Sequence, residues 1–118
     1  MVGACESAPT PNPSIEAPVE PIGASSIEGL ASLYEYGSGL LGVYVSVEPI
    51  DPAPSAADLR RGGCESTETL VHLGLQDPED PFEFDGDVEG TFASIRPVAV
   101  IVLDATGQPI GCASFPGP

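Results

Sequence analysis

The stretch from Arg96 to Phe115, RPVAVIVLDATGQPIGCASF, decides the fold of this 118-residue chain. Every residue from Val98 to Leu103 is apolar, and most are β-branched. Side chains alternate across a strand, so both faces of this segment are apolar and both must be covered. The run is far shorter than the roughly 20 apolar residues of a membrane-spanning helix. With a polar turn from Asp104 to Pro109, the stretch predicts a central strand and a return arm from Ile110 to Phe115.

The segment from Val102 to Phe115, VLDATGQPIGCASF, resembles the strand–turn–strand of prealbumin-like and bacterial immunoglobulin-like β-sandwich domains. In those families an apolar run is followed by aspartate, a short linker, glycine, any residue, proline, an aliphatic residue and small residues. The resemblance implies a sandwich fold. It implies no particular activity, because such sandwiches host unrelated functions.

Other segments carry the alternation of a sheet with one buried face. It is clear from Leu41 to Val47 and again from Glu68 to Leu75. The segment from Leu30 to Tyr36 also favours a strand, with a short helix capped by Ser25 or Ser26 as the alternative. We therefore predict a mainly β protein, a small antiparallel β-sandwich.

One short helix is expected from Ser55 to Arg61, SAADLRR. A serine cap opens it, good helix formers follow, and Gly62 and Gly63 come just after its end. Arg60 and Arg61 would then complement the C-terminal end of the helix dipole. The alternative is that they bind an anion.

Prolines divide the chain into a tail and a domain. Five of the 14 prolines lie between Glu6 and Gly23, where they favour an extended polyproline II conformation. Residues 1–24 are therefore expected to be a flexible, disordered Pro-rich tether, and residues 25–115 a single β-sandwich domain.

The net charge of -15 arises from 18 acidic residues and three basic ones, all arginine. A surface this negative repels phosphate groups, so nucleic acid is not expected as a partner. A basic protein partner remains compatible with it.

The first residues resemble the lipobox of bacterial lipoproteins. Val2 to Cys5 reads VGAC, an aliphatic residue and two small residues before a cysteine, and a polar Pro-rich stretch follows. The resemblance implies that Cys5 is lipidated, that a lipid membrane is a partner through this N-terminal anchor, and that the domain is extracytoplasmic, periplasmic or at the cell surface.

The chain has three cysteines. If Cys5 carries lipid, Cys64 and Cys112 remain as one disulfide pair, and an extracytoplasmic location suits that bond. The alternative is two buried free thiols in a cytosolic protein. Metal binding by thiolates is not expected, because the cysteine spacings are wide.

The segment from Gln76 to Gly90 is the most acidic part of the sequence, and a solvated loop is expected there. Acidic residues alternate just before Gly90, as at the start of an EF-hand calcium loop, but Arg96 occupies the place of the final glutamate. An irregular calcium site is the sharper alternative, with ligands from Asp77, Asp80, Asp85 and Asp87.

No catalytic residues are predicted. His72 is the sole histidine, and no serine or cysteine stands in a recognisable catalytic motif with it. The leading hypothesis is a non-enzymatic, extracytoplasmic, lipoprotein-like binding or structural domain. The alternative is a soluble acidic interaction protein, such as a nucleic-acid mimic or an inhibitor of a basic partner.

Overall fold

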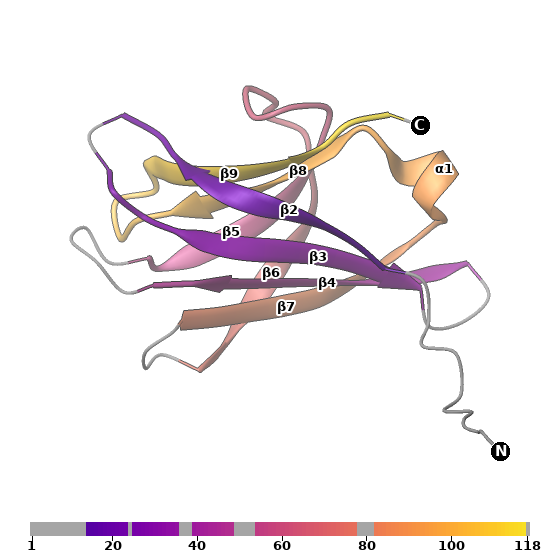
Figure 1. The fold of residues 1–118 in the computed structure, drawn as a ribbon, viewed down its shortest axis with the longest axis horizontal. Helices are drawn as coiled ribbons and strands as arrows, with labels where there is room; N and C mark the ends of the chain where they lie inside the picture. The colour runs from indigo at the N-terminus through magenta and orange to yellow at the C-terminus, as the bar shows by residue number, and fades with distance from the viewer. Residues whose placement is uncertain (1–13, 24, 36–38, 49–53, 78–81, 118) are drawn as a thin grey trace, which may run out of the picture.

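The computed structural model describes residues 14–23, 25–35, 39–48, 54–77 and 82–117. These residues form antiparallel strands and one short helix (Figure 1). In chain order the elements are β2 (Ser14–Pro21), β3 (Gly29–Glu35), β4 (Leu40–Val47), β5 (Ala56–Arg61), β6 (Thr69–Asp77), β7 (Phe82–Glu89), α1 (Phe92–Ile95), β8 (Val98–Leu103) and β9 (Pro109–Phe115).

The strands close into a barrel in the order β2-β3-β4-β7-β6-β5-β8-β9, and β9 pairs with β2. Strands β5, β6 and β7 are neighbours in sequence and in space. The chain then passes through α1 and returns so that β8 lies beside β5, which is a Greek-key connection. The predicted mainly β, antiparallel class is confirmed. The sheet closes on itself where two stacked sheets were expected, and closure removes exposed strand edges.

The hairpin of β8 and β9 confirms the expected strand, turn and return arm. Val98 pairs with Phe115 at one end, and Ile101 pairs with Cys112 near the middle. In the turn, Oδ1 of Asp104 accepts hydrogen bonds from the backbone N–H and hydroxyl of Thr106, at 2.9 and 2.7 Å, and from the N–H of Gln108 at 3.0 Å. The hydroxyl of Thr106 first, and then the N–H of Gln108, lower the pKa of the Asp104 carboxyl.

Both faces of β8 are covered, as its sequence requires. The inward face packs into the main core of the barrel, whereas Ala99 and Ile101 face outward and are fully buried with Cys112 in a second, smaller apolar cluster. Ile22 and Leu103 pack against this outer cluster. Strand β8 thus separates two apolar regions, one inside the barrel and one on its outer face.

The main core fills the barrel with aliphatic side chains and one fully buried phenylalanine, Phe84. Ile27, in the connection from β2 to β3, is fully buried, and Ile95 in α1 is almost fully buried. Figure 1 shows that this connection and α1 lie at opposite ends of the barrel. The two isoleucines therefore complete the core at its two ends.

The short helix predicted from Ser55 to Arg61 is wrong. Most of this segment is strand β5, which pairs with β6 on one side and β8 on the other. Pairing on two sides outweighs the modest helix propensity of the segment. The helix of the described chain is α1, where Thr91 and Ser94 form a reciprocal capping box.

Two other expectations are corrected. Ser14–Pro21 was assigned to the tether but forms β2, which pairs along β3 from Ser14↔Tyr34 to Val19↔Gly29. The boundary at residue 24 is therefore wrong for this segment, and residues 1–13 lie outside the described chain. The expected acidic loop contains β7, which lies between β4 and β6. The favoured strand near Leu30 is confirmed as β3.

Candidate functional site

A disulfide bond joins Cys64, in the loop between β5 and β6, to Cys112 in β9. The two cysteines are 48 residues apart in sequence, and their Cα atoms are 5.9 Å apart. The predicted Cys64–Cys112 pair is confirmed. Figure 1 shows the β5–β6 loop, in pink, rising beside the β8–β9 hairpin.

This disulfide loop, residues 62–68, is bonded through Cys64 to Cys112, a member of the outer apolar cluster. The N–H of Gly62 donates to the carbonyl of Pro97 at 2.8 Å, which fixes the start of the loop beside β8. Further along the loop, Cys64 is bonded to Cys112, whose side chain is only 4% exposed. The bond therefore holds the loop against the outer cluster at Cys112.

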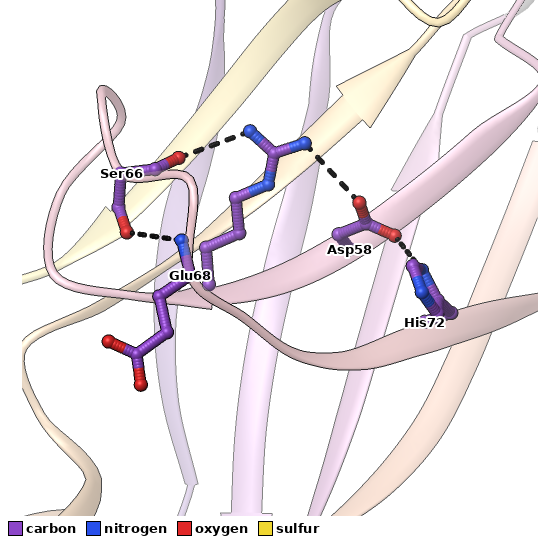
Figure 2. A network of polar contacts seen from close by, with 5 residues as sticks. Asp58, Ser66, Glu68 and His72 are labelled. Atoms are coloured by element: carbon purple, nitrogen blue, oxygen red, sulfur yellow. Dashed lines mark hydrogen bonds and ion pairs between the residues drawn. The ribbon is translucent and has the colours of Figure 1, made fainter.

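A buried acid is linked to the same loop through Arg60. Asp58 in β5 is 5% exposed, and its Oδ1 lies 2.7 Å from Nδ1 of His72 in β6. Its Oδ2 accepts from the Arg60 guanidinium at 3.3 Å, and that guanidinium also donates to the carbonyl of Ser66 at 3.1 Å. Ser66 in turn accepts from the N–H of Glu68 at 3.1 Å. Figure 2 shows this chain of contacts from the strand to the loop.

These contacts give the arginines a structural task. Arg60 connects Asp58 to the loop carbonyl, and Arg61 pairs with Glu68 at 3.3 Å on the exposed side. Nε of Arg60 is buried and has no hydrogen-bond partner among the described residues. The guanidinium therefore serves to connect Asp58 to the loop. The expected role of the arginines at a helix end is wrong, because no helix is formed there.

His72 lies on the outer face of β6, and its side chain is 81% exposed. Within the described chain its ring makes a polar contact with Asp58, and the cysteines at positions 64 and 112 are bonded to each other. The Asp58–His72 pair thus fixes the imidazole at the surface.

The outward face of β7 is a row of carboxylates. Glu83, Asp85, Asp87 and Glu89 alternate along the strand with Phe84, which is fully buried, and with other inward positions. On β4, Tyr44 is the register partner of Asp85 and Gly42 that of Asp87. We call the four carboxylates the β7 acidic row.

Two tyrosines border this row. Burial first, and then the negative charges of Asp85 and Asp87, raise the pKa of Tyr34. Burial also raises the pKa of Tyr44, with a hydrogen bond to Glu83 as the next cause. Because both pKa values are raised, both phenols stay neutral to a higher pH than an ordinary tyrosine. The outer face of β3, β4 and β7 therefore combines neutral aromatic hydroxyls with negative charge.

Three of the four candidate calcium ligands lie on two strands, and the fourth lies outside the described residues. Asp77 ends β6, Asp85 and Asp87 lie in β7, and Asp80 lies outside the described residues. The solvated loop expected before Gly90 is wrong for Phe82–Glu89, because these residues form strand β7. Among residues that are described, no group of three or more His, Cys, Asp or Glu side chains could hold a metal ion. The four-carboxylate calcium site stays a prediction.

The expected lipidation site, Cys5, and most of the predicted tether lie outside the described chain. In the part that is described, no helix has the length and apolar character needed to cross a membrane. The membrane anchor is therefore a prediction from the VGAC segment.

Comparison with protein-family models, with curated proteins and with solved structures found no match for this chain. The fold and the sites themselves define its class, a disulfide-bonded antiparallel Greek-key barrel with an acidic outer face.

Sequence reasoning missed Asp58 and the placement of Tyr34. An aspartate between Ala57 and Leu59, both core residues, was the available signal for a buried acid. The helix predicted from Ser55 to Arg61 hid this signal, because the alternation of a strand was not considered there. Nothing local indicates that Tyr34 lies against Gly42 of the next strand.

Proposed function

We propose that this chain is a non-enzymatic binding domain that works outside the cytoplasm. The observation that carries the proposal is the Cys64–Cys112 disulfide, which joins two segments 48 residues apart and has Cys112 in the outer apolar cluster. Disulfides form and persist in oxidising compartments and are rare in the cytosol. The resemblance of Val2 to Cys5 to a lipobox supports the same location and adds attachment to a membrane through lipid on Cys5.

The redox state of the native protein tests the location. Free thiols are alkylated during lysis of the source cells, and the protein is then analysed by mass spectrometry. The proposal expects Cys64 and Cys112 to be unmodified and bonded. Alkylation of both would overturn it.

The lipid anchor has its own test. The native protein is expected in the membrane fraction, with an N-terminal mass that includes lipid. A Cys5→Ala variant is expected in the soluble fraction with its barrel disulfide intact. If the Cys5→Ala variant still sediments with membranes, the anchor is not at Cys5.

A second candidate is a soluble acidic protein that binds a basic partner. It is favoured by the β7 acidic row, because its carboxylates lie on one folded face instead of in loops. Such a face attracts a cationic partner through its electric field and loses affinity as salt rises.

Charge-neutralising variants test this second candidate against a lysine-rich peptide. Neutralising the β7 acidic row, with Glu83→Gln, Asp85→Asn, Asp87→Asn and Glu89→Gln together, is expected to weaken binding. A control neutralises as many acids on other elements, with Glu16→Gln, Glu35→Gln, Glu48→Gln and Glu65→Gln. Equal loss in both variants would mean that net charge alone attracts the peptide and that the row is no specific site.

A further inference from the structure

Two adjoining hollows lie on either side of β2. The first, of about 280 Å³, is lined by Pro18, Pro21 and Ile22 of the β2 region and by the Cys64–Cys112 disulfide. The second, of about 540 Å³, extends from β2 over the connection to β3, where Glu28 lines it. Both are lined by Pro18, Glu20 and Pro21, so they adjoin across β2. We call this surface the β2 groove.

The groove lies at the seam between β2 and β9, where the ladder that closes the barrel is short. Strand β2 pairs with β9 at Glu20↔Cys112 and Pro21↔Gly111, whereas its ladder with β3 extends from Ser14 to Val19. Prolines lack the backbone N–H that a ladder needs, and Pro18 lies where the pairing with β9 would continue. The disulfide loop then provides a wall beside the seam.

The chemistry of the groove is apolar in the middle and acidic at the side. The lining combines the two prolines, Ile22 and the disulfide sulfurs with the carboxylates of Glu20 and Glu28. Beside this lining lies Leu30 in β3, the register partner of Pro18, whose apolar side chain is 43% exposed. An apolar centre with a polar rim is the usual anatomy of a protein interface.

The two rim carboxylates carry unbalanced charge. Among the described residues neither Glu20 nor Glu28 forms a salt bridge. The chain's three basic residues are engaged elsewhere: Arg60 with Asp58, Arg61 with Glu68, and Arg96 with the carbonyl of Phe92. Nothing in the described chain neutralises the rim, so a positively charged occupant would complement it.

Charge also decides against other occupants. A second copy of the chain brings a net charge of -15, and it would be repelled. Nucleic acids and anionic lipid surfaces are repelled for the same reason. Residues 1–13 of this chain contain no lysine or arginine, so they bring no cationic side chain to complement the rim.

We propose that the β2 groove binds an extended segment of a basic protein, with an apolar side chain against Pro18, Ile22 and Leu30 and lysine or arginine at Glu20 and Glu28. This deepens the proposed binding function and rests on it. Apolar contact supplies affinity at the centre, and the paired charges set the orientation and the choice of partner.

A short peptide of alternating lysine and leucine is the probe, titrated into the full chain labelled with ¹⁵N. Saturable shifts are expected at the amides of Ile22, Leu30 and Ser114. The Glu20→Gln/Glu28→Gln variant is expected to bind about five-fold more weakly, as two partly exposed charge pairs would give. Leu30→Ser, at an exposed position, is also expected to weaken binding. All of these variants change surface side chains, and their spectra check that the barrel is folded.

A matched variant and a matched peptide make the test decisive. Glu83→Gln/Glu89→Gln removes the same charge from the β7 acidic row and is expected to leave binding unchanged. A peptide with serine in place of leucine is expected to lose saturable binding. If the shifts instead map to Tyr34 and Tyr44, and the β7 variant is the weakened one, the groove proposal falls while the acidic-face candidate stands. Equal binding of both peptides, or no saturable binding at all, also overturns it, and neither result bears on the disulfide or the location.

Discussion

The phenol ring of Tyr34, in β3, lies against the backbone of Gly42, its register partner in β4. A Cβ atom at position 42 would overlap the ring. The tyrosine thus covers the backbone that a side chain would otherwise shield, an arrangement used to stabilise glycines in sheets. Its position also places the phenol near Asp85 and Asp87, whose charges add to burial in raising its pKa.

We expect Gly42→Ala to displace the Tyr34 ring and destabilise the barrel by roughly 1–3 kcal/mol, the usual cost of overpacking. Urea unfolding measures the change. Gly63→Ala is the control, because a Cβ there has no atom within 4 Å. Gly42→Ala should lower the free energy of unfolding less when it is added to a Tyr34→Ala variant than when it is added to the natural chain. If Gly42→Ala is as mild as the control, the contact is looser than described.

Removal of the disulfide should be costly. Replacing both cysteines, Cys64→Ala/Cys112→Ala, is expected to lower the free energy of unfolding by about 4 kcal/mol, since the bond closes a loop of 48 residues in the unfolded chain. The loss is measured by urea unfolding under oxidising conditions. A dithiol reductant should destabilise the natural chain similarly and leave the double variant unchanged. A reductant effect on the double variant would point to another cause.

Dye binding tests whether the disulfide loop shields the outer apolar cluster, to which it is bonded at Cys112. Without the bond, Ala99 and Ile101 should become accessible at neutral pH, and a dye that binds apolar surface should fluoresce more strongly with the double variant while the barrel is still folded. Unchanged dye binding would mean that the loop stays in place through its hydrogen bonds, such as that from Gly62 to Pro97.

Asp58 is expected to be the polar residue whose loss costs most. In Asp58→Asn the Arg60 guanidinium, whose side chain is 17% exposed, keeps its charge without a carboxylate partner. Breaking a largely buried pair in this way costs about 3 kcal/mol. His72→Ala is the control, because that side chain is 81% exposed and should cost little. Comparable losses in the two variants would contradict the structural role of the Asp58–Arg60 pair.

The tyrosines predict how stability changes in alkali. The folded pKa values of Tyr34 and Tyr44 are raised, so folding favours the protonated phenols. The resulting stability is fully present below the unfolded pKa of about 10 and is lost as pH rises through the folded values. Absorbance titration measures ionisation, and Tyr34→Phe and Tyr44→Phe assign each step. Asp85→Asn should move the Tyr34 step towards lower pH. Titration of both groups at or below the ordinary value would contradict the described environment.

The elements that could be predicted are those with local signals. The β8–β9 hairpin shows an apolar run and turn residues, and its turn is held by the Asp104 side chain as turn chemistry requires. Strands β4 and β6 show alternating apolar and polar residues. Strand β3 was favoured over a short helix near Leu30. The disulfide followed from the cysteine count together with the lipobox resemblance.

The elements that were missed depend on partners far along the chain. Prolines in β2 suggested a polyproline tether, but β2 is sheltered because β3 pairs along one side and β9 at one end. Acidity in β7 outweighed its alternation, although Phe84 is fully buried between β4 and β6. Asp58 is buried among contacts with Arg60 and His72, and Arg60 in turn bonds to the loop carbonyl of Ser66. Such contacts leave no local pattern.

The two-sided burial of β8 also limits how this protein can evolve. Its five residues from Val98 to Val102 are all buried, with cores on both faces, so neutral drift there is confined to exchanges among small and medium apolar side chains. Strand β7 differs, because every second position faces outward and can change charge at little cost to folding. Diverging descendants of this sequence should therefore keep β8 nearly intact while β7 records which charges their partners required.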